Sequence, residues 1–600
     1  MRRDQNKEKY LSSVAYFRLL ESKEERLLLV LSLLRLLTFI AGFFIIWLGF
    51  KISALAGIVL LLLDIFLFFF FLKLYSSHLE KKEFLNNLAL INQNEADAVS
   101  GDFSGFKSGT SYTDTGHDFS NDLDLFGEAS LFQYLNRTVT GYGQDILADW
   151  LSDPFAISSE LILRQEAIKE LSRKENWRHV FLASGMRKEL EKREISGLLK
   201  WLEESSLTKY SGIIKIVDYL LPAAALISLL LLTAGILHYS YFTFIFLSNL
   251  LYISAGLKKS NKIHAVLTSR YNYLSSMNGL LKTFENEEFS SEILTRIKMN
   301  ISGEKSSAAL SVRKLGHLIQ AFDTRLNIIV SIVLNGLLLW DYHIIYQLEK
   351  WKTENRKFFP GWLEMLGQAD AFVSLGNYAY NNPDFTYPVL SDKSPVFSSG
   401  NMGHPLIDED KRVCNDFTVE QYGTIFIVSG ANMAGKSTFL RTLAVNYLLG
   451  MTGAPVCAAQ MSFIPLKLFT SMRTSDSLSN NESYFYAELK RLKLLKSRIE
   501  NGEILLFILD EILKGTNSAD KSLGSKLFLK RLVELGATGL IATHDTSLGV
   551  MENEYPGLIF NKCFEIEIDG EIIKFDYKLQ NGVTQKMNAA LLMKQMGILD

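Results

Sequence analysis

Val428-Ser-Gly-Ala-Asn-Met-Ala-Gly-Lys-Ser-Thr438 decides the expected fold of the C-terminal part of this chain. From Gly430 to Ser437 the stretch carries the Gly-x-x-x-x-Gly-Lys-Ser pattern of a phosphate-binding loop. The residues before it, Thr424–Val428, predict a short buried β-strand, and those after it, Phe439–Leu449, predict a helix. A chance match or a plain glycine-rich turn is the alternative, and the flanking strand and helix argue against it. The stretch therefore predicts a nucleotide site.

Each residue type in this loop has a physical task at such a site. Gly430 and Gly435 let backbone N–H groups close around the β-phosphate at the N-terminus of the helix. Lys436 is expected to reach the β- and γ-phosphate oxygens, and Ser437 to offer its hydroxyl to Mg²⁺. The expected cofactors are therefore ATP and Mg²⁺.

Two further predicted strands end in residues that suit this chemistry. Gly502–Glu511 predicts an apolar strand, Ile504–Leu509, that ends in Asp510 and Glu511, and ligands collect at the carboxyl ends of parallel strands. Asp510 would hold Mg²⁺ through water, and Glu511 would orient or deprotonate the attacking water. A solvated Asp-Glu turn is the alternative. The strand Thr538–Thr543 ends at His544, which is either a γ-phosphate sensor or a hydrogen-bonded histidine at the edge of the sheet.

Other signals in this part of the chain are structural. The polar stretch Thr470–Glu488 predicts a loop that runs into a helix, with Ser483 as its N-cap. The segment Phe564–Lys578 alternates with period two about Asp569-Gly570, which predicts a β-hairpin.

Composition limits the class of protein. The 600 residues are too many for one core, so several domains are expected. The net charge of -2 gives no global attraction to nucleic acid, so any DNA contact would have to come from local patches. The 3 cysteines are scattered, which argues against a zinc site or a disulfide framework. The 40 phenylalanines are many for a soluble ATPase and gather in a few places.

The first of these places predicts a membrane hairpin. Leu27–Phe50 contains one charged residue, Arg35, and Ile52–Leu72 contains one, Asp64. Each run is long enough to span a hydrocarbon layer of about 30 Å, and neither fits a signal peptide. Arg35 and Asp64 lie at similar distances from Lys51, so we expect them to pair; the alternative is that Arg35 snorkels while Asp64 faces a protein interior.

A second apolar region predicts another hairpin. Residues 219–257 contain no Asp, Glu, Lys or Arg, and a turn is expected near His238-Tyr239-Ser240. Four membrane helices are therefore expected, and flanking basic residues place their outer ends in the cytoplasm. The later run Leu326–Trp340 is only about fifteen residues long, which favours a buried core helix over a fifth span.

The rest of the chain is predicted to be mainly helical. Ser100–Asn121 is rich in Gly, Ser, Thr and Asp and predicts a linker or surface loop. The apolar spacing in Leu123–Pro154 predicts two core-facing helices separated by a turn at Thr140–Gly143. A further helix is expected over Leu161–Leu171.

At this point the residues resemble the MutS family of DNA mismatch-repair ATPases. The loop that contains Asn432, Met433, Gly435 and Lys436-Ser437-Thr438 is similar to the family's Asn-Met-x-Gly-Lys-Ser-Thr form. Three other segments resemble family motifs: Asp510-Glu-Ile-Leu-Lys-Gly-Thr516, Ala542-Thr-His544 and His404-Pro405. The resemblance also takes in Leu123–Pro154 and the C-terminal Gly582–Gly597.

The resemblance implies an ABC-type ATPase that dimerises through its nucleotide domains. It places Gly430, Asn432, Met433, Gly435, Lys436, Ser437 and Thr438 on the nucleotide, Ser437 and Asp510 on Mg²⁺, and Glu511 and His544 in catalysis. Ser483 would contact the γ-phosphate bound by the neighbouring subunit, although Ser479-Asn-Asn-Glu-Ser483 departs from the usual Ser-Gly-Arg-Ser. No mismatch-reading domain with its Phe-x-Glu motif is evident, which puts mismatch recognition in doubt.

The expected fold is a mostly α-helical core with membrane hairpins and a C-terminal α/β P-loop (ABC-type) ATPase domain. The expected parts are a cytoplasmic N-terminal segment (1–26), transmembrane hairpin 1 (27–75), a linker or soluble segment (76–122), the first part of the MutS-like helical core (123–212), transmembrane hairpin 2 (213–257), the second part of the helical lever and core (258–395) and the MutS-like ATPase domain (396–600).

The function expected from these features is that of an ATPase anchored in the cell (inner) membrane, with cytoplasmic soluble domains and ATP hydrolysis coupled to DNA. The expected partners are a second copy of the chain, DNA and the lipid bilayer. One alternative is an ABC-type ATPase that drives a membrane or protein-complex rearrangement without DNA. A transporter is a weaker alternative, because four short-looped spans are few and no Leu-Ser-Gly-Gly-Gln signature is present.

Overall fold

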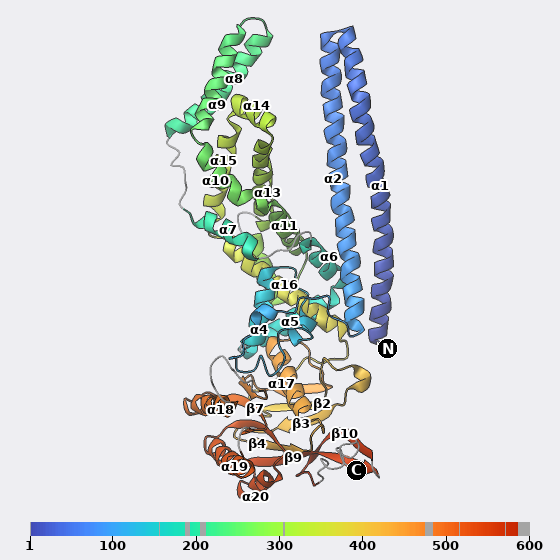
Figure 1. Ribbon diagram of the computed structural model, residues 1–600, viewed down its shortest axis with the longest axis vertical. Coiled ribbons are helices and arrows are strands. Elements are labelled where there is room, and N and C mark those ends of the chain that lie inside the picture. Colours follow the sequence, from blue (N-terminus) through green and yellow to red (C-terminus); the bar gives the residue numbers. More distant parts are fainter. Residues whose placement is uncertain are drawn as a thin grey trace.

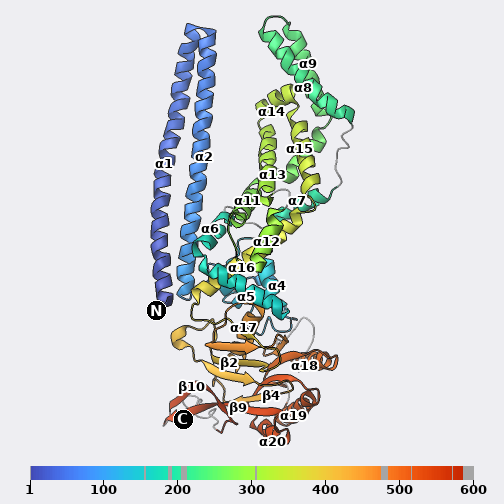
Figure 2. The ribbon, with the colours of Figure 1, turned by 180° about the vertical axis from the view of Figure 1, so that it is seen from behind.

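The computed structural model describes residues 2–154, 157–186, 192–204, 212–303, 307–473, 484–514, 517–569 and 572–585. The molecule is elongated, with two apolar helical hairpins pointing toward one end and an α/β domain at the other (Figure 1). A helical core lies between them, and the view from behind shows the same separation of the two hairpins (Figure 2).

The first hairpin consists of two very long helices, α1 (Arg2–Ile52) and α2 (Ala54–Val99). Ser53 breaks the helical run and caps α2, since its hydroxyl oxygen accepts a hydrogen bond from the N–H of Ala56 at 3.1 Å. Residues 76–99, which belong to the expected linker or soluble segment, form the second half of α2. They remain helical because Leu85, Leu88 and Ile91 recur at helical spacing and are buried against the core.

The register of this hairpin separates Arg35 from Asp64. The guanidinium of Arg35 lies over the ring of Tyr75, 4.9 Å from its centroid. Asp64 packs against Gly42, where an added Cβ would come within 2.6 Å of both carboxylate oxygens. The predicted pairing is therefore wrong. It assumed a turn at Lys51, whereas the helices are separated at Ser53, so Arg35 and Asp64 lie at different heights along the hairpin.

The foot of the hairpin is tied to the core by buried polar contacts. Glu95 of α2 accepts hydrogen bonds from Arg137 Nε and Asn381 Nδ2, each at 2.6 Å. Tyr10 of α1 donates to Asn381 Oδ1 at 2.8 Å. Both hairpin helices thus meet at Asn381, the last residue of α16 (Phe359–Asn381).

Residues 100–127 follow α2, and we call this segment the strap. Apart from the short 3-10 helix η1 (Thr110–Tyr112) it has no regular structure, which agrees with the loop predicted over Ser100–Asn121. It runs from the hairpin foot to the α/β domain.

The helical core packs around α16. Besides α16 it comprises α3 (Leu131–Leu135), α4 (Gly141–Ser152), α5 (Ser158–Arg173), α6 (Glu175–Gly185), α7 (Lys192–Glu203), α11 (Tyr271–Glu285), α12 (Glu292–Ser302), α13 (Ala308–Asp323) and α15 (Trp340–Asn355). The Thr140–Gly143 segment begins α4 and does not form the turn before it, because Thr140 Oγ1 accepts from the N–H of Gly143 at 2.9 Å. Asp370 of α16, fully buried, accepts from the N–H and the hydroxyl of Thr140.

The second apolar region consists of α8 (Gly212–Thr233) and α9 (Tyr239–Ser254), followed by α10 (Leu257–Leu267) and packed against α14 (Ile328–Leu338). Helix α14 was expected in a buried core, yet Ile328 and Ile329 are 74% and 75% exposed. It lies beside an apolar hairpin, not inside the core. Within the described residues, three helices are long and apolar enough to cross a membrane, or up to five if each of two bent helix pairs counts as one span.

The C-terminal domain contains two sheets. A four-stranded sheet has the order β1-β5-β2-β3, from β1 (Val389–Leu390), β2 (Phe397–Met402), β3 (Asn415–Val419) and β5 (Gln460–Phe463). A six-stranded sheet has the order β10-β9-β4-β8-β7-β6, from β4 (Ile425–Gly430), β6 (Lys467–Ser471), β7 (Leu505–Asp510), β8 (Thr538–Thr543), β9 (Ile559–Asp569) and β10 (Ile572–Asn581). All neighbours in the six-stranded sheet are parallel except β9 and β10, the predicted hairpin.

Alternating side chains bury both faces of the six-stranded sheet. Phe426 and Val428 belong to the large core cluster that includes α17 (Lys436–Thr452). Ile425 and Ile427 belong to a second cluster with α18 (Tyr484–Glu500) and α19 (Ser518–Glu534). The sheet is therefore covered on both sides, and its carboxyl-end edge is left for a site.

Candidate nucleotide site

The glycine loop joins β4 to α17 through backbone conformations that favour glycine. Gly435 caps α17 with φ 105°, and a Cβ there would lie 3.1 Å from the ring of Tyr577. Gly430 has φ 158°, and a Cβ would lie 3.0 Å from the carbonyl oxygen of Phe564. Met433 also has a positive φ, 65°. The loop is thus a tight turn that aims at the N-terminus of α17, where backbone N–H groups favour an anion.

Lys436 folds back over this loop. Its Nζ donates hydrogen bonds to the carbonyl oxygens of Gly430 at 2.8 Å and Ala431 at 2.9 Å. The side chain is buried, and burial lowers the pKa of Lys436 to about 8, against the opposing effect of the acids Glu511 and Asp510.

Ser437 and Asp510 meet across the ends of α17 and β7. The hydroxyl of Ser437 donates to Asp510 Oδ2 at 2.5 Å. The other carboxylate oxygen of Asp510, Oδ1, is buried without a hydrogen-bond partner. Because an unpartnered buried carboxylate oxygen is costly, this pair suits a divalent cation, and oxygen ligands of this kind are those that Mg²⁺ prefers.

Glu511 and His544 form a second pair at the same edge. His544 Nε2 contacts Glu511 Oε1, and His544 Nδ1 donates to the carbonyl oxygen of Gly430 at 2.8 Å. The hydrogen bond from His544 lowers the pKa of Glu511 to about 2, so the carboxylate is ionised at neutral pH. The ends of β4, β7 and β8 are thereby brought together.

A cavity of about 500 Å³ lies over these residues. Its lining includes the sequence-predicted residues Asn432, Met433, Gly435, Lys436, Ser437, Thr438, Glu511 and His544. Asp510 lies beneath it, bonded to Ser437. His404, from the predicted His-Pro segment, lines it too, and burial lowers the pKa of His404 to about 4. Ser483, and Gly515-Thr516 of the second motif, lie outside the described residues.

The sequence did not single out Tyr577 as a cavity residue. It comes from β10, where the pairing with β9 shifts between Phe575 and Leu579. Tyr577 sits in this irregularity with φ 53°, and its carbonyl oxygen accepts from Asn415 Nδ2 at 3.0 Å. Regular alternation in the predicted hairpin gave no sign of it, because a bulge re-aims a side chain without changing the residue pattern.

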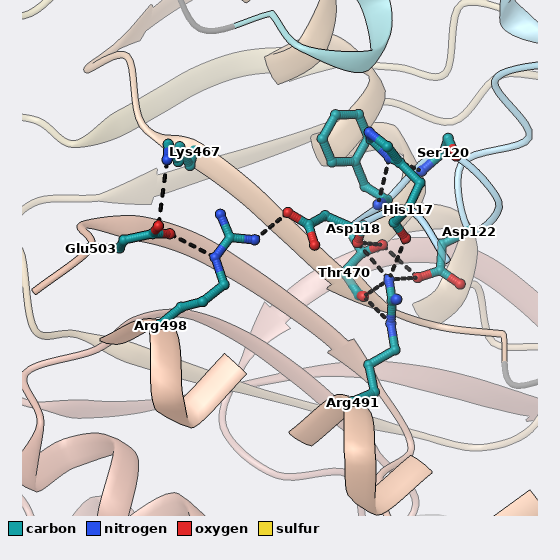
Figure 3. Close-up of polar contacts among 10 residues, drawn as sticks. His117, Asp118, Ser120, Asp122, Lys467, Thr470, Arg491, Arg498 and Glu503 are labelled. Atoms are coloured by element: carbon teal, nitrogen blue, oxygen red, sulfur yellow. Dashed lines mark hydrogen bonds and ion pairs between the residues drawn. The ribbon is translucent and has the colours of Figure 1, made fainter. Parts of the chain in front are cut away.

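Polar contacts join the strap to the α/β domain (Figure 3). Asp122, whose side chain is 3% exposed, accepts from Thr470 Oγ1 at 2.5 Å and from the N–H of Arg473 at 2.7 Å. Arg491 of α18 donates to the carbonyl oxygens of Asp118 at 2.6 Å and Thr470 at 2.8 Å. The strap is thus bound to the end of β6 and to α18.

Further contacts extend the strap to the helix that follows the glycine loop. Arg498 of α18 pairs with Asp118 and Glu503. Arg441 of α17 lies 3.3 Å from Asp124, which also pairs with Arg473. The segment that follows the hairpin therefore contacts two helices of the nucleotide-site domain.

Comparisons with known proteins agree with the C-terminal motifs. A family model described as MutS domain V matches residues 426–597. The DNA mismatch repair protein MutS of Thermotoga maritima is 29% identical over 243 residues, which cover 40% of this chain and 30% of that protein. The MutS protein of Lachnoclostridium phytofermentans is 29% identical over 269 residues, 43% of this chain and 28% of that protein.

A eukaryotic relative shows the same level of similarity. MutS protein homolog 4 of Homo sapiens is 29% identical over 226 residues, which cover 36% of this chain and 24% of that protein. These findings support a relationship to the MutS family over part of the chain. The aligned segment spans less than a third of the length of each of these relatives.

Proposed function

We propose that the protein is a membrane-anchored MutS-like ATPase, in which Mg²⁺-dependent ATP binding and hydrolysis are coupled to DNA binding. One observation carries the proposal: Lys436, Ser437-Asp510 and Glu511-His544 converge on one cavity at the carboxyl edge of a parallel sheet. This arrangement offers separate groups for phosphate, for a divalent cation and for a water nucleophile.

The cavity, of about 500 Å³, lies in the usual size range of small-molecule sites. Gly435, Lys436 and Ser437 lie at its phosphate end, next to the N-terminus of α17. Ile407 and Val413 supply apolar surface elsewhere in the lining, which suits a base, whereas the ring of Tyr577 lies next to Gly435. Ser437 and Asp510 would hold Mg²⁺, which would stabilise charge on the phosphates, while Glu511 would orient the attacking water.

The similarity to MutS proteins supports two further parts of the proposal. Two copies would associate through their ATPase domains, and Ser483 of each would complete the nucleotide site of the other. DNA is the proposed ligand coupled to hydrolysis, since the matched relatives are named as DNA mismatch repair proteins.

The apolar hairpins supply the proposed anchor in the cell (inner) membrane. Exposed side chains such as Phe43, 79%, and Ile52, 80%, cover α1 near the hairpin tip, and Leu251, 74%, lies on α9. A contiguous apolar surface of this kind on a helix long enough to span is typical of contact with lipid. Both hairpins point away from the α/β domain (Figure 1). The basic residues that flank the outer ends of the hairpins support a cytoplasmic side for that domain.

The test is the ATPase rate of the detergent-solubilised protein and of Glu511→Gln, each with and without duplex, mismatched and branched DNA. Stimulation by DNA that is lost in Glu511→Gln is the expected result. Hydrolysis indifferent to every DNA would contradict the DNA-coupled function and favour an ATPase that drives a membrane or protein-complex rearrangement. Lack of hydrolysis by the unchanged protein would overturn the proposal.

A further inference from the structure

The turn that carries Glu511 has an unusual backbone. After β7 ends at Asp510, Glu511 has φ 53° and Leu513 has φ 61°. Residues with side chains rarely adopt this left-handed conformation, and two of them within three positions persist only where the surroundings fix them.

Among the described residues, Lys514 Nζ lies 3.8 Å from Glu511 Oε2 within the turn, and three sets of contacts join the turn to neighbouring elements. Two of these three sets are ordinary. The N–H of Glu511 donates to the carbonyl oxygen of Ala542 in β8 at 2.9 Å. The side chains of Ile512 and Leu513 are buried in the core cluster of α18 and α19, where Leu513 packs on Gly524. These contacts hold the start of the turn and its apolar side chains. They do not provide hydrogen-bond acceptors for the backbone N–H groups of Leu513 and Lys514.

The third contact is a buried carboxylate from another element. Glu488 of α18 is 3% exposed, and it accepts from the N–H of Leu513 at 2.5 Å and from that of Lys514 at 3.1 Å. Two successive N–H groups that point at one anion form a concave site for it, here filled by a side chain of the same chain. Its two oxygens each receive one hydrogen bond, so the carboxylate spans the turn.

We propose that Glu488 is a positioning residue for Glu511, and the inference rests on the proposed ATPase function. By holding the N–H groups of Leu513 and Lys514, Glu488 fixes the turn in the conformation that presents the Glu511 carboxylate to the cavity and to His544. Glu488 is absent from the residues that line the cavity, whereas Glu511 is among them. Its effect on the reaction is therefore indirect and acts through the backbone.

The geometry predicts how substitutions at this position differ. Alanine removes both acceptors and leaves the buried N–H of Leu513 and the part-buried N–H of Lys514 without this partner. Glutamine keeps one acceptor oxygen but turns an NH₂ group toward the second N–H, so it preserves half of the contact. The order of activity should therefore be Glu, then Gln, then Ala.

The test is steady-state ATP hydrolysis by the full-length protein in detergent, with kcat and KM measured separately. Glu488→Ala should lower kcat by about 10- to 100-fold, since a small misplacement of a reacting group costs up to that much, and leave KM and the binding of a fluorescent ATP analogue unchanged. The kcat of Glu488→Gln should lie between that of Glu488→Ala and that of the unchanged protein. The matched control is Glu500→Gln at the other end of α18, where an exposed glutamate pairs with Arg531 and Lys496; it should behave as the unchanged protein.

A double variant separates positioning from a general structural role. If Glu488 acts through Glu511, Glu488→Ala should add no further loss of single-turnover rate in a Glu511→Gln background. If Glu488→Ala lowered the single-turnover rate by the same factor with Glu511 present and with Glu511→Gln, the inference would be overturned. A raised KM with unchanged kcat in Glu488→Ala would also overturn it. Should Glu488→Ala fail to fold, the cycle is run with Glu488→Gln. Lack of hydrolysis by the unchanged protein would overturn the proposed function, whereas hydrolysis insensitive to Glu488 would overturn the inference alone.

Discussion

Glu511 and His544 are in direct contact across the ends of two neighbouring parallel strands, β7 and β8. His544 also donates to the carbonyl oxygen of Gly430 at 2.8 Å, at the end of β4. One side chain therefore connects the proposed general base to the start of the glycine loop. A movement of the loop on binding phosphate would therefore shift His544 and, through it, the carboxylate of Glu511.

Replacing Glu511 by glutamine should abolish most hydrolysis while sparing nucleotide binding. The amide keeps the volume of the side chain but cannot take a proton, and general-base catalysis contributes about 10²- to 10⁴-fold. Phosphate release and the affinity for a fluorescent ATP analogue measure the two effects. Glu554→Gln, an exposed glutamate paired with Lys526, is the control. Unchanged turnover in Glu511→Gln would refute the assigned role.

ATP affinity should weaken as pH rises above the lowered pKa of Lys436, about 8. The protonated amine is the form that attracts phosphate, so affinity is full below this pH. Above it, binding must first return a proton to Lys436, and affinity should fall by up to about tenfold per pH unit. Equilibrium binding from pH 7 to 9.5 measures the slope. Lys436→Met should bind weakly with no such slope; a constant affinity of the unchanged protein across this range would contradict the prediction.

Asp122→Ala should loosen the strap from the α/β domain. The substitution removes a buried carboxylate and leaves Thr470, the N–H of Arg473 and the nearby Arg491 without it. Breaking such a buried charged contact costs about 3 to 5 kcal/mol. Hydrogen exchange of strap amides should accelerate strongly. The matched control is Asp124→Asn, at an acid of the same segment whose side chain is 46% exposed; asparagine tolerates the left-handed backbone there (φ 51°), and the change should be about 1 kcal/mol or less. Equal exchange in the two variants would show that burial of Asp122 is not what holds the strap.

Glu95→Ala should destabilise the foot of the first hairpin. Arg137, whose side chain is 3% exposed, would lose its carboxylate partner and remain buried with its charge. The expected loss is about 3 to 5 kcal/mol, seen as a lower unfolding midpoint in detergent. Glu25→Ala, which breaks the more exposed pair with Lys82 on the same hairpin, should change the midpoint little. A midpoint unaffected in both would rule out a structural role for the Glu95-Arg137 pair.

Local sequence patterns predicted the elements around the site well. The strand before the glycine loop, the helix after it and the strands that end at Asp510 and Thr543 all lie where apolar runs and motif spacing placed them. Each depends on residues adjacent in the chain, so periodicity is sufficient. The catalytic and cofactor-binding roles given to these residues remain predictions.

Features that depend on contacts between distant segments could not be read in this way. The Arg35-Asp64 pairing failed because it needed the exact turn position of a hairpin. Tyr577 reaches the cavity through a bulge, and Glu488 meets the turn after Asp510 only because α18 packs beside β7. Helix α14 was assigned to the core from its length, whereas its neighbour, an apolar hairpin, determines its exposure.

The first hairpin is a long helical arm that is attached to the core near one end. Helix α1 has 51 residues, which gives a length of about 76 Å. The described polar contacts that tie the hairpin to α16 and Arg137 lie near its foot, at Tyr10 of α1 and Glu95 of α2. A tilt of about 5° at the foot would sweep the tip through about 7 Å at this length. If a bilayer held the tip in place, the relationship would be inverted. A lateral displacement of several ångströms at the tip would then rotate the hairpin by a few degrees at its foot, where the strap begins.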